Sequence, residues 1–425
     1  MILFNPVKPV VIQVFKLALA LSCLLIQAGC RNETTKNDAA VVSGPDTDLP
    51  SLYERQGTLA KAPEWPKTKA KVEDLKRRIV RSPKDVKPRL QVAAIYMAEA
   101  RITGEHPYYY PAILSILDDV LALEPANFEA LIYKASVKMS QHQFAEAKAI
   151  AGQARQLNPN NAYIYGVLVD ANVELGNYEE AVAMSDRMQV LKPSLESYSR
   201  ASYLREIYGD YPGAIQAMQL AVEAGLPGSE PHCWSKKTLG YLYEQTGKPI
   251  LAERQYREIL AMRPSYAFAL HGLARVHKSR KQYDQALTLL DSAARIMPEF
   301  SFHEEMAEIY GLRGETVRMR EKYRQVITML SDDARSGHRV DLELCNVYTA
   351  AGQLDSARVY GLREYRKRPN NIDVNAALAR MYYRSNDFPK AQQHLKVARR
   401  TGSKDPELIA LARSMEPTRR IAFAK

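Results

Sequence analysis

The sequence predicts an all-α protein, a right-handed α-solenoid of about nine helix-turn-helix hairpins with capping helices. The main observation is a short segment that recurs along the chain, in which a large apolar residue usually stands three positions before an Ala. The copies end at Ala147, Ala181, Ala214, Ala252, Ala286, Ala357 and Ala391, with a degraded copy at Met319. Prolines recur in step with them, at Pro125, Pro159, Pro193, Pro227, Pro264, Pro298 and Pro369. A period of about 34 residues is that of a two-helix repeat.

Each recurring residue type has a physical role in a helical hairpin. Ala is small, so two antiparallel helices can approach closely where the second one starts. A large side chain three positions earlier, such as Phe144 or Tyr178, fills the turn. Glycines such as Gly176 and Gly352 end the first helix, because only glycine adopts the left-handed conformation cheaply. Proline stops the second helix or opens the next one. One hairpin cannot bury its whole apolar face, so neighbouring hairpins must stack.

These landmarks resemble the tetratricopeptide repeat over residues 86–406. Eight repeats carry the turn landmark, and a more divergent repeat with Ala112 and Pro125 precedes them. Residues 67–85 are expected to form a basic N-terminal capping helix, and residues 407–425 a C-terminal cap and tail. The stretch 318–336 is the irregular point of the array, where a bend is expected.

The N-terminus predicts export. Residues 1–29 contain two lysines followed by a ten-residue apolar run, Leu17 to Ile26, which is too short to span a membrane. The sequence Gln27-Ala28-Gly29-Cys30 then resembles a bacterial lipobox, which implies lipidation of Cys30 and attachment to a bacterial membrane. Ordinary secretion or an uncleaved anchor are the alternatives, since Gln27 stands where that family has an apolar residue. Residues 30–66 lack an apolar period and are expected to form a flexible tether.

The formal charge of +11 raises the question of nucleic acid. Export and the scatter of the charges along helices argue against that partner. One concentrated stretch, Lys67 to Arg89, is interpreted either as a solvated helix face or as a contact for anionic headgroups or an acidic partner.

No catalytic motif is found, and the predicted repeats, tether and signal account for nearly the whole chain. We therefore expect no enzyme activity, no cofactor and no metal site. Cys233 and Cys345 fall three hairpins apart, too far for a disulfide within the chain, and Cys345 occupies a small-residue position where an inert packing role is expected.

The tetratricopeptide resemblance implies a concave groove lined by the first helix of each hairpin. The implied groove residues are Trp234, Lys237, Tyr241, His271, Arg275, Lys278, Arg339, Asn346, Arg380, Tyr383 and Arg384, after an acidic N-terminal part with Glu129, Asp170 and Glu206. The groove is thus expected to change from acidic to basic along the array. Tyr241 stands where the family's carboxylate clamp has Asn, which argues against binding of a chaperone tail.

The functional hypothesis is a non-enzymatic scaffold or assembly factor at the bacterial cell envelope that binds an unidentified protein partner in this groove. Its location would be a bacterial membrane, the outer membrane or a periplasm-facing leaflet. The alternative is recognition of an acidic polysaccharide or glycan by the Arg-rich C-terminal groove, which would show a steep dependence on ionic strength.

Overall fold

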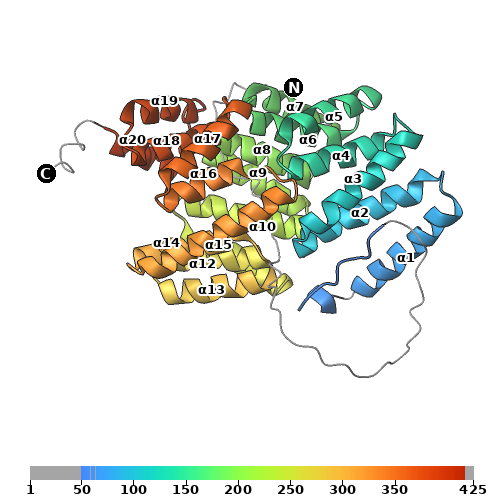
Figure 1. The fold of residues 1–425 in the computed structure, drawn as a ribbon, viewed down its shortest axis with the longest axis horizontal. Coiled ribbons are helices and arrows are strands. Elements are labelled where there is room, and N and C mark those ends of the chain that lie inside the picture. Colours follow the sequence, from blue (N-terminus) through green and yellow to red (C-terminus); the bar gives the residue numbers. More distant parts are fainter. Residues whose placement is uncertain (1–48, 58, 63, 417–425) are drawn as a thin grey trace.

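The computed structural model describes residues 49–57, 59–62 and 64–416, and this part of the chain is built from helices (Figure 1). It contains twenty α-helices and one short 3-10 helix, η1 (Leu59–Lys61), and no β-strand. The predicted signal peptide, Cys30 and residues 417–425 lie outside the described residues.

Eighteen of the helices pair into nine antiparallel hairpins, each packed on the next. The first four hairpins are α2 (Val86–Thr103) with α3 (His106–Leu123), α4 (Phe128–Ser140) with α5 (Phe144–Leu157), α6 (Ala162–Leu175) with α7 (Tyr178–Leu191), and α8 (Leu195–Ile207) with α9 (Tyr211–Ala224). The next five are α10 (Glu230–Gln245) with α11 (Pro249–Met262), α12 (Ala267–Ser279) with α13 (Tyr283–Ile296), α14 (Phe300–Leu312) with α15 (Thr316–Arg335), α16 (Asp341–Ala350) with α17 (Leu354–Lys367), and α18 (Ile372–Arg384) with α19 (Phe388–Ala398). The predicted all-α solenoid is confirmed.

Single helices precede and follow the hairpins. Helix α1 (Trp65–Arg81) packs on α2, and α20 (Pro406–Ser414) contacts α19. Most basic side chains of α1 are exposed, but Lys76 is buried beside Glu73.

The recurring Ala and Gly residues occupy the predicted conformations. The seven landmark Ala residues are completely buried. Gly176 and Gly352 have φ of 80° and 79° at the hairpin turns. His142, Lys281 and Asn386 take the same left-handed conformation in repeats that lack the glycine, with φ between 57° and 60°. This use of non-glycine residues was not anticipated from the sequence.

The irregular stretch around residue 318 lies within α15, which is the longest helix of the described chain with 20 residues. Met319 replaces Ala at the close approach of α14 and α15. Gly311 on α14 compensates, because a Cβ atom there would lie 3.2 Å from the Met319 sulfur. The larger side chain is thus accommodated by a smaller one opposite.

The segment 49–57, which we expected to be part of a flexible tether, packs against the first hairpin. Arg55 is 4% exposed and forms two hydrogen bonds of 2.8 and 2.9 Å with the Glu99 carboxylate. The Tyr53 backbone N–H donates to the Tyr109 hydroxyl, and the Tyr108 hydroxyl donates to the Ser51 carbonyl. The tether prediction failed here because it relied on the absence of an apolar period. The segment is instead held by individual side chains, including Leu49 and Leu52, which pack against the core of the first hairpin.

The array also closes on itself, which the sequence did not predict. Three successive hairpin turns in the first half (at residues 141–143, 176 and 209) contact three successive loops in the second half (residues 337–339, 368–371 and 400–404). We call this line of contacts the seam. Figure 1 shows the red C-terminal helices next to the green helices α6 to α8.

An apolar cluster lies behind the seam and joins the two halves. Val173 and Tyr203 from the first half pack in one buried cluster with Ile372, Leu408 and Met415 from the second half. The closure therefore buries apolar surface as well as making hydrogen bonds, and it places residues of both halves around one interior space.

Candidate functional site

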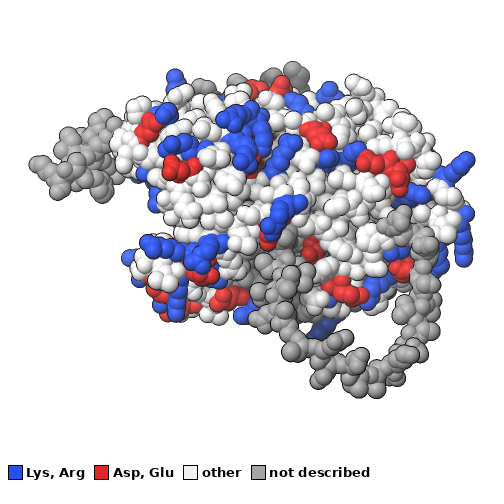
Figure 2. All heavy atoms as spheres, in the orientation of Figure 1, with Lys and Arg blue, Asp and Glu red and all other residues white. Residues whose placement is uncertain are grey.

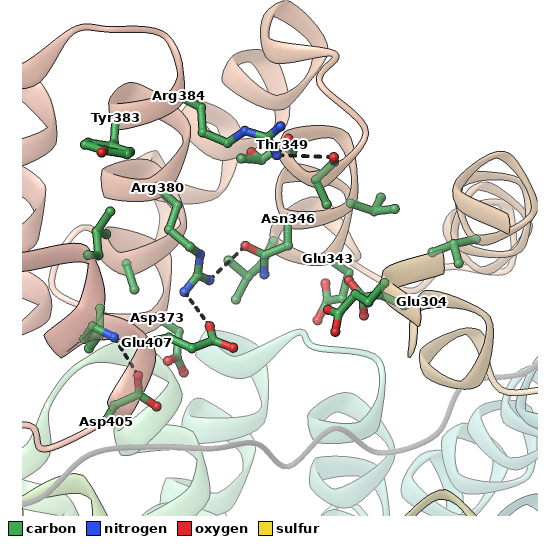
Figure 3. A pocket seen from close by; sticks show the side chains of 18 of the residues that line it. Glu304, Glu343, Asn346, Thr349, Asp373, Arg380, Tyr383, Arg384, Asp405 and Glu407 are labelled. Atoms are coloured by element: carbon green, nitrogen blue, oxygen red, sulfur yellow. Dashed lines mark hydrogen bonds and ion pairs between the residues drawn. The ribbon is translucent and has the colours of Figure 1, made fainter. Parts of the chain in front are cut away.

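A cavity of about 710 Å³ lies at this closure. Its walls come from the turn at His142, from α14, α16 and α18, and from α20, so both halves of the array and the C-terminal cap contribute (Figure 3). Apolar side chains such as Leu342, Val347 and Leu411 line part of it. The volume is within the range of natural ligand sites.

The charged lining of the cavity is predominantly acidic. Seven carboxylates and three guanidinium groups line it. The carboxylates are those of Glu174, Glu304, Glu308, Glu343, Asp373, Asp405 and Glu407, and the guanidinium groups are those of Arg368, Arg380 and Arg384. We expected a basic groove at this end of the array. The structure instead places acidic residues around the predicted arginines.

The arginines of the C-terminal repeats are held by groups of the protein itself. Arg380 donates to the Asn346 side-chain oxygen at 3.2 Å and pairs with Glu407 at 3.4 Å. Arg384 donates to the backbone carbonyls of Thr349 and Ala350 at the end of α16 (Figure 3). These contacts use the side chains that were predicted to hold a partner.

Two cavity carboxylates lack a strong partner. Asp373 makes no hydrogen bond or ion pair within the described residues, and Figure 3 shows it near Asp405 and Glu407. Burial, and next the charge of Glu174, raise the pKa of Asp373 to about 7. Glu343 faces the His142 ring at 3.8 Å, and its Oε2 atom is buried without a hydrogen-bond partner in the described chain.

The seam forms one wall of the cavity. Arg368 pairs with Glu174 at 2.6 Å and with Glu364 at 2.5 Å, and it also donates to the Glu174 carbonyl. Its guanidinium lies 4.7 Å from the centre of the Phe144 ring. Opening the seam would therefore open the cavity.

Three predicted groove residues, Trp234, Lys237 and Tyr241, line a second cavity of about 40 Å³. Glu206 also lines it, is 2% exposed and has a side-chain oxygen without a hydrogen-bond partner in the described part of the chain. Burial, and next Arg275, lower the pKa of Lys237 to about 8. This space suffices for one or a few water molecules and not for a peptide.

The remaining predicted residues do not line either cavity. Arg275 forms two hydrogen bonds of 3.0 Å with Glu244 of the preceding repeat, while His271 and Lys278 both contact Glu305 of the next one. Arg339 is exposed, and only its backbone takes part in the seam. Of the eleven predicted groove residues, the large cavity thus brings together Asn346, Arg380, Tyr383 and Arg384.

Sequence reasoning missed all seven cavity carboxylates. Asp373 could have been found, because it lies seven residues before Arg380 on α18, and residues two helical turns apart share a face. Glu304 and Glu308, four residues apart on α14, follow the same rule. No helical spacing relates Glu174, Asp405 and Glu407 to a predicted groove residue, because only the closure of the array brings them to the cavity.

Both cysteines of the described residues are buried. Burial raises the pKa of Cys345 to about 12, and both Cys233 and Cys345 are free thiols. In the described residues, no group of three or more His, Cys, Asp or Glu side chains could hold a metal ion. None of the helices in residues 49–57, 59–62 and 64–416 combines the length and apolarity needed to cross a membrane.

Comparison with known proteins identifies the repeats. Family models described as tetratricopeptide repeat match residues 138–194 and 237–299. The chain therefore contains tetratricopeptide repeats, as the spacing of its landmarks predicted.

Curated proteins match part of the chain in sequence. The mitochondrial import receptor subunit TOM70 of Homo sapiens is 26% identical over 291 residues, which are 63% of this chain and 46% of TOM70. The match to TOM70 of Rattus norvegicus has the same identity and coverage over 293 residues. The chain thus spans about half the length of these curated relatives.

One solved structure shares the fold over most of its length, and another is similar in part. The human IFIT1 dimer with m7Gppp-AAAA has a TM-score of 0.50 at 15% identity, covering 74% of this chain and 71% of that one. The Cut9-Hcn1 hetero-tetramer of APC/C has a TM-score of 0.45 at 13% identity, covering 84% of this chain and 64% of that one.

Proposed function

We propose that this protein is a non-enzymatic interaction scaffold that holds a segment of a partner protein in the large cavity. The observation that carries the proposal is a space of about 710 Å³ inside a tetratricopeptide array, lined by apolar side chains, Tyr383 and charged groups. This mixture is typical of ligand-binding sites, where apolar contact supplies affinity and polar groups fix orientation. The similarity to an import receptor subunit supports a protein-binding role.

The proposed site of action is a bacterial cell envelope, with the chain attached through a lipid on Cys30. The lipobox-like sequence before Cys30 supports this, and the exposed basic residues of α1 are suited to anionic headgroups. Replacing Cys30 with Ala should release the protein from membranes in fractionation. Full retention in the membrane fraction would contradict the lipid anchor.

Binding of an acidic polysaccharide, the alternative, has less support. Arg380 and Arg384 already donate to Glu407, Asn346 and backbone carbonyls. Lys and Arg on the face in Figure 2 occur in several separated groups, many of them beside acidic side chains, and not as one basic track. A polyanion would have to displace these contacts and approach the carboxylates behind them.

A photo-crosslinking experiment tests the protein-binding role. A photoreactive amino acid is placed at Tyr383 in the cavity or, as a control, at Val359, which is 57% exposed and does not line the cavity. Irradiation of intact cells should give a defined crosslinked partner segment from position 383 alone, and mass spectrometry should map it. The Ala410→Trp substitution, on an exposed residue of α20 that lines the cavity, should abolish it. Equal products from both positions would contradict the proposal.

A further inference from the structure

The charges of the large cavity indicate what kind of segment it holds. Carboxylates outnumber guanidinium groups by more than two to one, and each arginine already has partners in the protein. A buried carboxylate without a compensating cation is costly, because it loses its hydration. The cavity as it stands therefore lacks positive charge.

Two places within the cavity show this deficit. One is at Glu343, which lines the cavity and whose side chain is 15% exposed. Glu343 has a buried oxygen without a hydrogen-bond partner in the described part of the chain. On the other side, Asp373 makes no hydrogen bond or ion pair among the described residues and lies near Asp405 (Figure 3).

The cations nearby do not remove the deficit. The hydrogen bonds of Arg380 go to Asn346 and Glu407, although its charge also favours the ionised form of Asp373. Arg368 is shared between Glu174 and Glu364. The group facing Glu343 is the imidazole of His142, at 3.8 Å, which carries charge only when protonated.

We propose that the segment bound in this cavity is basic and carries at least two Lys or Arg side chains, one paired with Glu343 and the other with Asp373. This inference rests on the proposed function and specifies the partner's chemistry. The apolar walls at Leu342, Val347 and Leu411 add a preference for apolar residues between the two basic ones. An acidic segment would place like charges against these carboxylates, which disfavours its binding.

A fluorescence-anisotropy assay tests the inference with synthetic peptides. The probe is a set of fluorescein-labelled decapeptides of fixed apolar content, with two variable positions that are both Lys, both Gln or both Glu. The separation of these two positions is varied from two to six residues. The proteins are the chain lacking residues 1–29, its Glu343→Gln and Asp373→Asn variants, the double variant, and Ala410→Trp. Asp355→Asn is the matched control, because the Asp355 side chain is 99% exposed and lies outside the cavity.

The Lys peptides should bind most tightly at one preferred separation. Each single variant should weaken them about tenfold, which corresponds to about 1.4 kcal/mol, and the double variant should weaken them further. Asp355→Asn should change nothing. Circular dichroism of each variant confirms that its helices are intact, and the single variants provide the test if the double variant does not fold.

Other outcomes separate the inference from the proposed function. If the Gln or Glu peptides bind most tightly and Ala410→Trp abolishes their binding, the cavity holds peptides but the inference about charge is wrong. The same conclusion follows if Lys peptides bind equally well to the wild type and the double variant. If no peptide binds in a manner sensitive to Ala410→Trp, both the inference and the proposed function are overturned.

Discussion

Arg368 and Glu174 lie 194 residues apart in the sequence, and their ion pair of 2.6 Å joins the two halves of the array. The Arg368 side chain is 6% exposed and that of Glu174 is 17% exposed. Asn371 adds a hydrogen bond of 3.0 Å to the Glu174 carbonyl, and the Tyr178 hydroxyl accepts one from the Ile372 N–H. The seam is therefore a specific contact with partners on both sides.

Replacing Arg368 with Met should open the seam. Removing one partner of a buried ion pair typically costs about 3–5 kcal/mol, because the other charge is left uncompensated. Here Glu174 and Glu364 would both be left without their guanidinium. We expect a lower urea midpoint and a larger radius of gyration in small-angle X-ray scattering. Arg324→Met, in an exposed pair with Glu321, is the control and should change neither value. An unchanged radius for Arg368→Met would show that the apolar cluster alone keeps the array closed.

Gly176→Ala should be more destabilising than Gly352→Ala, although both glycines have φ near 80°. Each substitution costs about 1–2 kcal/mol for a Cβ atom in the left-handed conformation. At Gly176 the Cβ atom would also lie 2.5 Å from the Asn370 backbone across the seam, whereas at Gly352 nothing lies within 4 Å. Thermal unfolding of the two variants measures the difference. Equal melting temperatures would mean that the seam adjusts freely.

Asp333→Asn should stabilise the protein at pH 8 and have little effect at pH 4. Asp333 is completely buried, and neither carboxylate oxygen has a hydrogen-bond partner in the described chain. Burial, followed by the charges of Glu299 and Glu343, raises its pKa to about 8. The folded state thus keeps this proton to a higher pH than the unfolded chain, so its stability falls as the pH rises from about 4 to about 8.

The urea midpoints of the wild type and Asp333→Asn should therefore diverge steadily between pH 4 and pH 8. The gap should exceed about 1 kcal/mol at pH 8, given about 1.4 kcal/mol for each unit of pKa difference. The exposed Asp355→Asn variant should follow the wild type throughout. A constant gap between Asp333→Asn and the wild type would contradict the raised pKa.

Binding of a Lys peptide should release a proton near pH 7. Asp373 has a pKa of about 7, set first by burial and then by Glu174, Arg368, Arg380 and Asp405. A bound cation favours the ionised carboxylate and lowers that pKa, so affinity should rise between pH 6 and pH 8. Calorimetry in buffers with different ionisation enthalpies measures the released proton. The Asp373→Asn variant should show no release from this site. Release that persists in this variant would assign the proton to another group.

The local architecture could be predicted from the sequence because it depends on short-range rules. Ala147 and Ala391 are small where two helices meet, and Gly176 and Gly352 are left-handed where a helix ends, whatever the rest of the chain does. Prediction failed at Arg55 and its segment, whose contacts depend on single side chains.

The closure could not be predicted, because it results from small rotations that accumulate over many hairpins. Arg368, Asn371 and Arg400 stand in loops where a repeat protein usually has solvated residues, and their types alone do not reveal a partner on a distant repeat. Four of the predicted groove residues nevertheless lie in the cavity, since the rule that the first helices face inward survives closure. The carboxylates that dominate the cavity come from α14, α16, α18, α20 and the end of α6, and only the closed array brings them together.

The apolar cluster behind the seam changes how the array should come apart. In an open repeat protein each unit touches only its neighbours, so the end units fray first and the remainder stays folded. Here Val173 and Tyr203, near the middle of the first half, share their packing with Leu408 and Met415 at the far end. Loss of the last helices therefore removes contacts from the third and fourth hairpins as well. We therefore expect the third and fourth hairpins and the C-terminal helices to unfold together in one cooperative transition, and not by fraying from one end.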